Sequence, residues 1–237
     1  LVPRSTPGIE ILRNVGLLHE SLDEPGAHGW VRYNNVRLPA DAVLGEPGKA
    51  FELAQKRLGG GRIHHAMRTV AYCQKALDML CERALSRETQ GSLLADKQTV
   101  QNYIADSFIQ LEQFRLLVLY AAWWCDKGDP RKSRIYISAV KVQAAEVLHD
   151  IVRRAIQVHG ALGCSNETPL AGLWATVPMM GVMDGPSEVH RVTVARQVLR
   201  QHEPSQDALW PDEWLPGKIE AARKKFADYL DDTVGNL

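Results

Sequence analysis

The strongest candidate for acid–base chemistry in this chain is the carboxylate of Asp184, which stands directly before a Gly-Pro pair. That pair predicts a helix start, because proline suits the first helical turn. An apolar run, Val177–Met183, precedes the carboxylate, and a carboxylate at the positive end of a helix can serve as a general base. Helix capping explains the same spacing without catalysis, so both interpretations stay open. His190 either contacts this carboxylate or is a polar residue satisfied elsewhere.

A second candidate is the run Gly59-Gly60-Gly61-Arg62, which lies inside a pattern of apolar residues with helical spacing. Each glycine costs a helix up to about 1 kcal/mol relative to alanine. The simplest interpretation is a loose helix start or a kink. The alternative is that a ligand or another segment needs close access to the backbone here.

Arg87 is a third candidate, at the predicted end of a long helix. Its charge suits the negative end of the helix dipole, and Gly91 can serve as the C-terminal cap. The functional alternative is that the guanidinium binds a phosphate through two parallel hydrogen bonds.

The composition is typical of a globular chain and excludes several classes of protein. Of 237 residues, 45% are hydrophobic and 24% charged, and Lys+Arg equals Asp+Glu at 28 each. Without a net charge or a single-sign tail, we expect no binding to nucleic acid or to an anionic membrane. The longest uncharged apolar run, Leu116–Cys125, is too short to span a bilayer. The widely spaced cysteines predict reduced thiols in an intracellular protein, and no metal site.

The chain changes character twice along its length. Residues 1–47 alternate short apolar segments with turn residues, which predicts the last strands of a β-domain. Because the chain starts directly in such sequence, we expect a missing N-terminal part of the protein. Residues 48–202 predict a helical domain, and residues 203–237 predict a tail with prolines, tryptophans and a short helix.

Within the helical domain, apolar residues recur at spacings of three, four or seven. This predicts helices over roughly 49–86, 93–127 and 131–159, and from Gly185-Pro186 to about Arg200. Short connections between long helices imply antiparallel neighbours. The predicted fold class is therefore mainly α: an up-down four-helix bundle preceded by strands.

Four motifs follow one another along the chain: Thr6-Pro-Gly-Ile9, Ala84-Leu-Ser-Arg-Glu-Thr-Gln-Gly91, Gln157-Val-His-Gly-Ala-Leu-Gly163 and Asp184-Gly-Pro-Ser-Glu-Val-His-Arg191. Their order and spacing resemble the C-terminal part of an acyl-CoA dehydrogenase. The similarity is greatest to the subgroup with a Gly-Arg-Ile-His-His motif, here Gly61–His65, and an Asp at the start of the last motif. The resemblance covers about residues 1–202 and implies a C-terminal four-helix-bundle domain.

The resemblance also assigns residues to ligands. Arg87 resembles an arginine that contacts the FAD diphosphate across a dimer interface. The segment at the adenosine end of that FAD corresponds to Gln157, Val158, His159, Gly160 and Ala161, and the flavin contact at a helix start corresponds to Pro186, Ser187 and Glu188. The stretch along the CoA thioester chain corresponds to Gly59, Gly60, Gly61 and Arg62, with Gly185 as a further substrate contact.

Asp184 takes the place of the catalytic base, which most such enzymes carry as a glutamate in a Tyr-Glu-Gly-Thr motif. This chain reads Met183-Asp-Gly-Pro186 there. Aspartate supplies the same carboxylate on a stem one methylene shorter, so the substrate has to lie closer or in a different pose. The departure leaves the length and branching of the acyl chain open. It also leaves open a nitroalkane-oxidase-like reaction, which uses an aspartate base on the same fold.

The resemblance implies FAD-dependent α,β-dehydrogenation of an acyl-CoA in fatty-acid β-oxidation, with Asp184 as the base. It further implies a homodimer or a dimer of dimers, and an electron-transfer flavoprotein as electron acceptor. The expected compartment is the cytoplasm in a bacterium, and the mitochondrial matrix or the peroxisome in a eukaryote. The competing hypothesis is a non-catalytic helical subunit or fragment that completes the flavin site of a partner chain.

Overall fold

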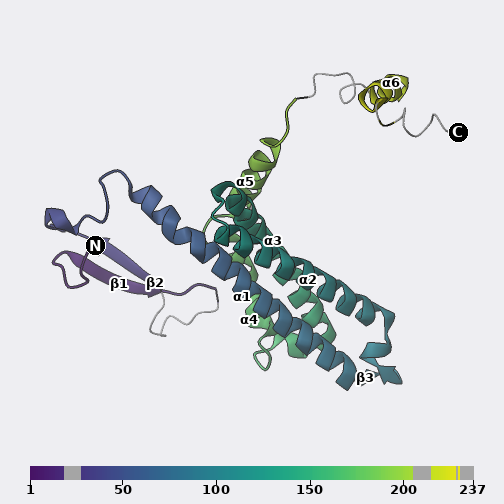
Figure 1. Ribbon diagram of the computed structural model, residues 1–237. Coiled ribbons are helices and arrows are strands. Elements are labelled where there is room, and N and C mark those ends of the chain that lie inside the picture. The colour runs from purple at the N-terminus through teal and green to yellow at the C-terminus, as the bar shows by residue number, and fades with distance from the viewer. Residues whose placement is uncertain (19–27, 205–214, 228, 230–237) are drawn as a thin grey trace. The chain divides into compact units, whose positions relative to one another are not determined.

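The computed structural model describes residues 1–18, 28–204, 215–227 and 229, and most of them are helical (Figure 1). The chain divides into two compact units, Leu1–Val194 and Ala195–Leu237. Helix α5 (Ser187–Leu199) runs across that division. The predicted fold class, mainly helical with strands at its start, is confirmed. The predicted domain limits at 47/48 and 202/203 stay predictions.

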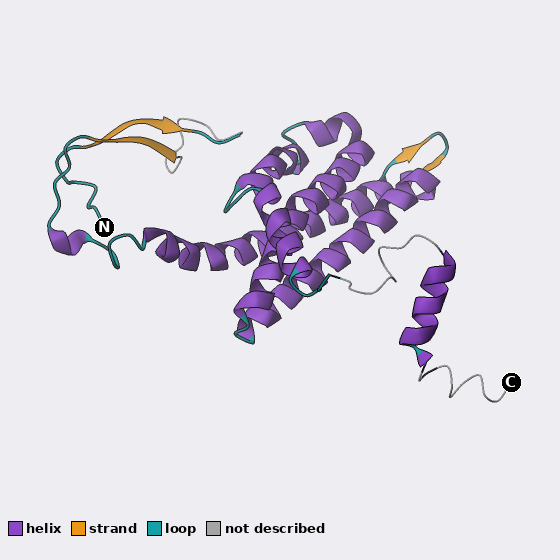
Figure 2. Cartoon of the chain, turned by 90° about the horizontal axis from the view of Figure 1, so that it is seen from above, coloured by secondary structure: helices purple, strands orange, loops and turns teal. Residues whose placement is uncertain are grey.

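Four helices of the first unit pack together: α1 (Ala50–Ser86), α2 (Gln98–Asp126), α3 (Pro130–His159) and α4 (Leu170–Val182). α3 is central, because it packs against α1, α2 and α4 (Figures 1 and 2). Successive helices are antiparallel, so α1 and α3 end at the same end of the bundle. The site described below depends on this arrangement.

The central helix α3 is held by an apolar face that recurs every three or four residues, as an amphipathic helix requires. The most deeply buried members of this face are Val140, Ala144, Val147, Leu148, Ile151, Val152 and Ala155. Lys141 is an exception on the same helix, since its charged side chain is fully buried. A buried ammonium group requires polar partners, and these lie in the candidate site.

α1 is a continuous helix through Gly59–Gly61, so the expected loose helix start at the glycines is wrong. The helix ends at Ser86, where a small hairpin of β3 (Glu88–Thr89) and β4 (Ser92–Leu93) follows. Gln90 and Gly91 form its two-residue turn, with φ of 51° and 75°, as a type I′ turn requires. Gly91 is therefore a hairpin-turn residue and not the expected helix cap.

α4 is a helix that the periodicity of the sequence does not predict. It is largely apolar and contains Pro178, so it shows neither a polar face nor high helix propensity. The apolar run before Asp184 forms its last turns. The fourth helix packed on α3 is thus α4, and the predicted last helix follows as α5. α2 begins at Gln98, later than expected, because a 3-10 turn precedes it.

The strands β1 (Ile9–Val15) and β2 (His28–Tyr33) form an antiparallel hairpin, with Ile9 opposite Tyr33. Large apolar side chains on both strands are exposed, among them Ile11, Trp30 and Tyr33. A two-stranded hairpin is marginally stable by itself. The exposed apolar side chains of this hairpin therefore add little to its stability through burial.

In the second unit, α6 (Leu215–Lys225) is a short helix within the tail. The tryptophans of that tail, Trp210 and Trp214, lie outside the described residues. In the ranges that are described, no helix combines the length and the apolar character needed to cross a membrane.

Candidate active site

Asp184 lies in the loop between α4 and α5 in a left-handed backbone conformation. Its φ is 56°, and that of Gly185 is 111°. A non-glycine residue in this region costs on the order of 1 kcal/mol, so surrounding contacts have to hold it. Arg62 of α1 donates a hydrogen bond from Nε to the Asp184 carbonyl oxygen over 2.9 Å. This bond fixes the loop to α1.

Lys141 holds the same region from α3. Its Nζ donates a hydrogen bond to the carbonyl oxygen of Met180, near the end of α4. Burial lowers the pKa of Lys141 and the charge of Arg62 adds to this, whereas the charge of Asp184 opposes both. The carbonyl and the carboxylate are thus the groups that stabilise a buried ammonium at this position.

The carboxylate of Asp184 faces α1 and is only 11% exposed. His65 Nε2 lies 3.2 Å from Oδ2, and Arg57 Nη1 lies 3.9 Å from Oδ1 on a side chain that is 78% exposed. Oδ2 is buried and has no hydrogen-bond partner among the described residues, since the His65 ring is not aligned with it. The carboxylate therefore has one enclosed oxygen and one oxygen on the side of an exposed cation.

Gly61 permits this close approach of α1 to the loop. A Cβ atom at position 61 would lie 2.9 Å from Asp184 Oδ2, whereas Gly59 and Gly60 have nothing within 4 Å of such an atom. The need for close packing within the glycine run therefore applies to Gly61. The sequence pattern does not show which of the three glycines is needed for close packing, whereas the structure identifies Gly61.

The surroundings of His65 favour its neutral imidazole. Burial lowers its pKa and the charges of Arg68 and Lys141 add to this effect, whereas Asp184 opposes it. His65 lies beside the carboxylate of Asp184, and the sequence analysis assigned it no role. The sequence feature that points to His65 is its position four residues after Gly61, because residues at this spacing lie on one face of α1.

His190 is buried and satisfied by two other groups, so it does not contact the carboxylate. Its Nδ1 lies 3.3 Å from Ser138 Oγ, and its Nε2 lies 3.4 Å from the Asp184 carbonyl oxygen. Burial lowers the pKa of His190, although the backbone contact with Asp184 opposes the shift. Of the two interpretations, the structure favours the satisfied polar residue.

A groove of about 800 Å³ adjoins the loop and is bounded by parts of α1, α3 and α5. Arg62 and His190 contribute to its wall, Lys56 and Arg134 supply further positive charge, and Phe51 supplies apolar surface. Its volume lies within the usual range for small-molecule sites, roughly 300–1,000 Å³. The groove is therefore large enough for an extended, anionic ligand.

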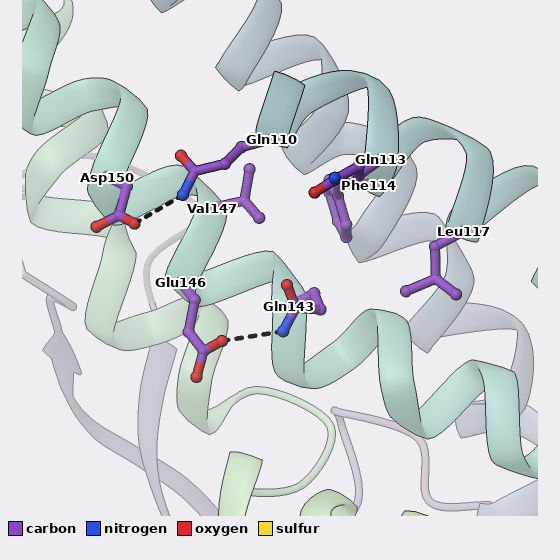
Figure 3. A pocket seen from close by; sticks show the side chains of 8 residues that line it. All are labelled: Gln110, Gln113, Phe114, Leu117, Gln143, Glu146, Val147 and Asp150. Atoms are coloured by element: carbon purple, nitrogen blue, oxygen red, sulfur yellow. Dashed lines mark hydrogen bonds between the residues drawn. The ribbon is translucent and has the colours of Figure 1, made fainter. Parts of the chain in front are cut away.

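A second hollow lies between α2 and α3 and is lined by both polar and apolar side chains (Figure 3). Gln110 donates to Asp150 over 3.1 Å, and Gln143 donates to Glu146 over 3.0 Å. Glu146 also forms an ion pair with Arg191. The Gln110–Asp150 bond links α2 to α3 and the Glu146–Arg191 pair links α3 to α5, so these polar groups are paired within the protein.

The structure brings together some of the predicted site residues and separates others. Gly61, Arg62, Asp184 and Gly185 meet at the loop. Pro186 and Glu188 are exposed at the start of α5. Ser187 is buried there, and its Oγ donates to the Gly181 carbonyl oxygen over 3.3 Å.

The predicted contacts for the distal part of FAD lie at the other end of the bundle. Arg87 and Gln157 are exposed at the ends of α1 and α3. Because a helix rises about 1.5 Å per residue, Arg87 lies roughly 37 Å along α1 from Arg62. Gly160 and Ala161 are also exposed at this end, whereas the side chains of Val158 and His159 are buried in the bundle and are not available to a ligand.

Comparison with known proteins identifies the family. The model of the acyl-CoA dehydrogenase C-terminal domain matches residues 48–199. The chain belongs to the acyl-CoA dehydrogenase family. It is 41% identical over 201 residues to acyl-CoA dehydrogenase family member 11 of Rattus norvegicus, a match that covers 84% of this chain and 26% of that protein.

Solved structures of the family share the fold. A candidate acyl-CoA dehydrogenase from Mycobacterium abscessus is 44% identical, with a TM-score of 0.79 over 85% of this chain and 49% of its own. Butyryl-CoA dehydrogenase from Megasphaera elsdenii is 27% identical, with a TM-score of 0.75 over 84% of this chain and 51% of its own. This chain thus spans about half the length of the solved structures it matches, and about a quarter of the rat relative.

Replacing Gly61 by alanine tests the close approach of α1 to the loop. Gly60→Ala is the matched control, because it gains the same helix propensity in open space and should stabilise the fold by up to about 1 kcal/mol. Gly61→Ala should gain less or destabilise, since its methyl group has to displace the Asp184 carboxylate. Denaturant unfolding of both variants measures the difference. Equal stabilisation would show that the approach is not tight.

The lowered pKa values of His65 and His190 predict a loss of stability in mild acid. As the pH falls below the unfolded value of about 6.5, the unfolded chain binds protons that the folded chain does not. The free energy of unfolding should then fall by at most about 1.4 kcal/mol per pH unit for each ring. Unfolding midpoints between pH 7.5 and pH 5.5 measure this slope. His65→Gln should make the slope shallower, and an unchanged slope would contradict the assignment of His65.

Proposed function

We propose that this chain carries the catalytic half of a flavin-dependent acyl-CoA dehydrogenase, in which Asp184 removes the α-proton of an acyl-CoA thioester. The observation that carries the proposal is the carboxylate of Asp184, which is largely enclosed and held by contacts from two helices. Membership of the family supports the same reaction class. Because this chain spans only part of its relatives, the activity belongs to the complete enzyme.

In the proposed reaction, the protein supplies the base, its position and an environment poor in water. Arg62 and Lys141 hold the backbone on either side of the base, which keeps the carboxylate at a fixed place relative to the groove. Oδ1, on the side of Arg57, is the oxygen suited to take the proton, since Oδ2 is enclosed by His65 and Gly61. A positioned general base contributes roughly 10²–10⁴-fold to the rate.

We further propose that the cofactor is FAD, which when bound supplies the oxidant for the β-hydrogen. The exposed guanidinium of Arg87 has no side-chain partner within the described residues, which suits a diphosphate. Gln157, Gly160 and Ala161 are exposed at the same end of the bundle. These residues therefore fit one end of a dinucleotide, although Val158 and His159 do not contribute side chains.

The proposed FAD contacts of one chain belong to two different cofactors. About 37 Å of helix separates Arg87 from Arg62, so the residues near the base and the residues at the far end cannot share one flavin ring. This distance supports the proposal of a homodimer or a dimer of dimers, in which Arg87 reaches the FAD of a neighbouring chain. An electron-transfer flavoprotein as acceptor, and a place in fatty-acid β-oxidation, remain parts of this proposal.

Asp184→Asn in the complete enzyme tests the assignment of the base. Asparagine keeps the size and hydrogen-bonding capacity but cannot take up the α-proton. The variant should keep FAD and acyl-CoA affinity and lose at least about 10²–10⁴-fold in the rate of flavin reduction. Glu188→Gln is the comparison, because Glu188 is an exposed carboxylate in the first turn of α5. Stopped-flow bleaching of the flavin by an acyl-CoA measures both.

The outcomes of that experiment separate the competing hypotheses. A fast Asp184 variant together with a slow Glu188 variant would move the base to Glu188. If the unmodified enzyme binds FAD but no acyl-CoA bleaches it, the chain is a scaffold for a partner's flavin site. Bleaching by a nitroalkane alone would assign the oxidase-type reaction.

Arg87→Ala tests the second part of the proposal. If the guanidinium binds the FAD diphosphate, its removal should weaken FAD binding by about 1.5–3 kcal/mol, the scale of a hydrogen bond to a charged group. Arg131→Ala removes an equal charge from an exposed position at the start of α3 and should leave FAD affinity unchanged. Titration of the apoenzyme with FAD gives the dissociation constants. Equal constants for the Arg87 variant and the parent would remove Arg87 from the site.

A further inference from the structure

The protonation of the His65 ring follows from its neighbour on α1. Arg68 Nη2 lies 3.0 Å from His65 Nδ1. An arginine side chain has only donors, so Nδ1 of His65 has to accept this hydrogen bond. A neutral imidazole carries one proton, and that proton therefore lies on Nε2. Arg68 thus selects one tautomer of His65.

The Nε2 atom of His65 lies beside the carboxylate of Asp184, although the ring is not aligned with it as a hydrogen-bond donor. The Nε2 atom lies 3.2 Å from Oδ2, and Oδ2 is the buried oxygen that has no hydrogen-bond partner in the described part of the chain. A buried acceptor left unpaired is costly, and a small rotation of either ring or carboxylate completes the bond. Of the two ion-pair contacts of the Asp184 carboxylate in these residues, the one with His65 reaches Oδ2 and the one with Arg57 reaches Oδ1.

We propose that His65 is a positioning residue for Asp184: Arg68 holds it as the Nε2–H tautomer, and that N–H fixes Oδ2 so that Oδ1 faces the substrate. The inference rests on the proposed role of Asp184 as the base and adds a defined orientation to it. The imidazole stays neutral and neither gives nor takes a proton in the reaction. Its function is to decide which of the two carboxylate oxygens takes up the α-proton.

The other charged groups around the carboxylate do not replace this contact. Arg57 and Arg62 of α1 approach Oδ1 and the backbone carbonyl, respectively. Lys141 of α3 bonds to the carbonyl of Met180, and His190 of α5 contacts the Asp184 carbonyl. α4 carries no charged residue. The orientation of the carboxylate about its own axis therefore depends on His65.

Two substitutions at position 65 in the complete holoenzyme test the proposal by activity. His65→Phe keeps a ring of similar shape without a donor and should slow flavin reduction by an acyl-CoA about 10–100-fold, because misplacement of a reacting group by about 1 Å has effects of this size. The KM should change little. His65→Gln restores an N–H donor and should recover most of the rate. His64→Phe is the matched control, since His64 is exposed on α1 and does not contact the carboxylate.

The same variants should differ in the pH dependence of flavin reduction. Loss of the donor removes a hydrogen bond to the ionised carboxylate, so the acid limb of the profile should move to higher pH in His65→Phe and stay near its original place in His65→Gln. A purely structural effect of the substitution would lower the rate at every pH without moving the limb. An unmoved limb in His65→Phe, or an equal loss in His65→Gln, would overturn the proposal.

A third measurement does not depend on activity. In ¹⁵N spectra of the histidine-labelled holoenzyme, Nε2 of His65 should be protonated and Nδ1 should not. In Asp184→Asn, the pKa of His65 should fall further, because the carboxylate charge that raises it has been removed. A protonated Nδ1, or a ring that titrates identically in both proteins, would overturn the inference. If the expected spectra occur in an enzyme that no acyl-CoA reduces, the His65–Asp184 contact stands and the proposed function fails.

Discussion

The close contact between α1 and the loop at Asp184 is the constraint on which the rest of the site depends. It requires the absence of a side chain at Gly61, because a Cβ atom there would lie 2.9 Å from the carboxylate. The same helix then places Arg62 on the backbone carbonyl and His65 beside the enclosed oxygen. A glycine that weakens α1 locally thus allows three contacts of the helix with one loop, at positions 61, 62 and 65. The packing of α1 on α3 offsets the cost of this glycine.

Antiparallel packing of successive helices places the two groups of proposed ligand contacts at opposite ends of the bundle (Figure 1). α1 and α3 both begin near the loop and both end near the exposed Arg87 and Gln157. The length of α1 fixes the separation between the two groups at more than 30 Å. Neither group can be brought to the other by side-chain motion, so a complete site of the proposed kind needs more than one chain.

The sequence predicts the long helices well because their apolar residues recur with a helical period that a central bundle helix such as α3 requires. It fails at α4, which is apolar on all faces and therefore shows no period, although its end positions Asp184. Asp184 and Arg62 are found from motifs, and His65 stands in one of these motifs without an assigned role, whereas Lys141 is not found. A buried lysine cannot be distinguished from an exposed one by spacing, and the role of His65 depends on a loop far away in the sequence.

The short side chain of Asp184 and the glycine of α1 are two parts of one geometric solution. With an aspartate, the carboxylate stays close to its own backbone, and that backbone is held in a strained conformation by Arg62. Oδ2 then has to lie against α1, which is possible only because position 61 has no side chain. A longer acid at position 184 would carry its oxygens past His65 and lose this arrangement. The orientation of the carboxylate is therefore set by the helix rather than by the loop. In the proposed reaction, the reacting carbon of a substrate would approach the oxygen that the helix leaves free.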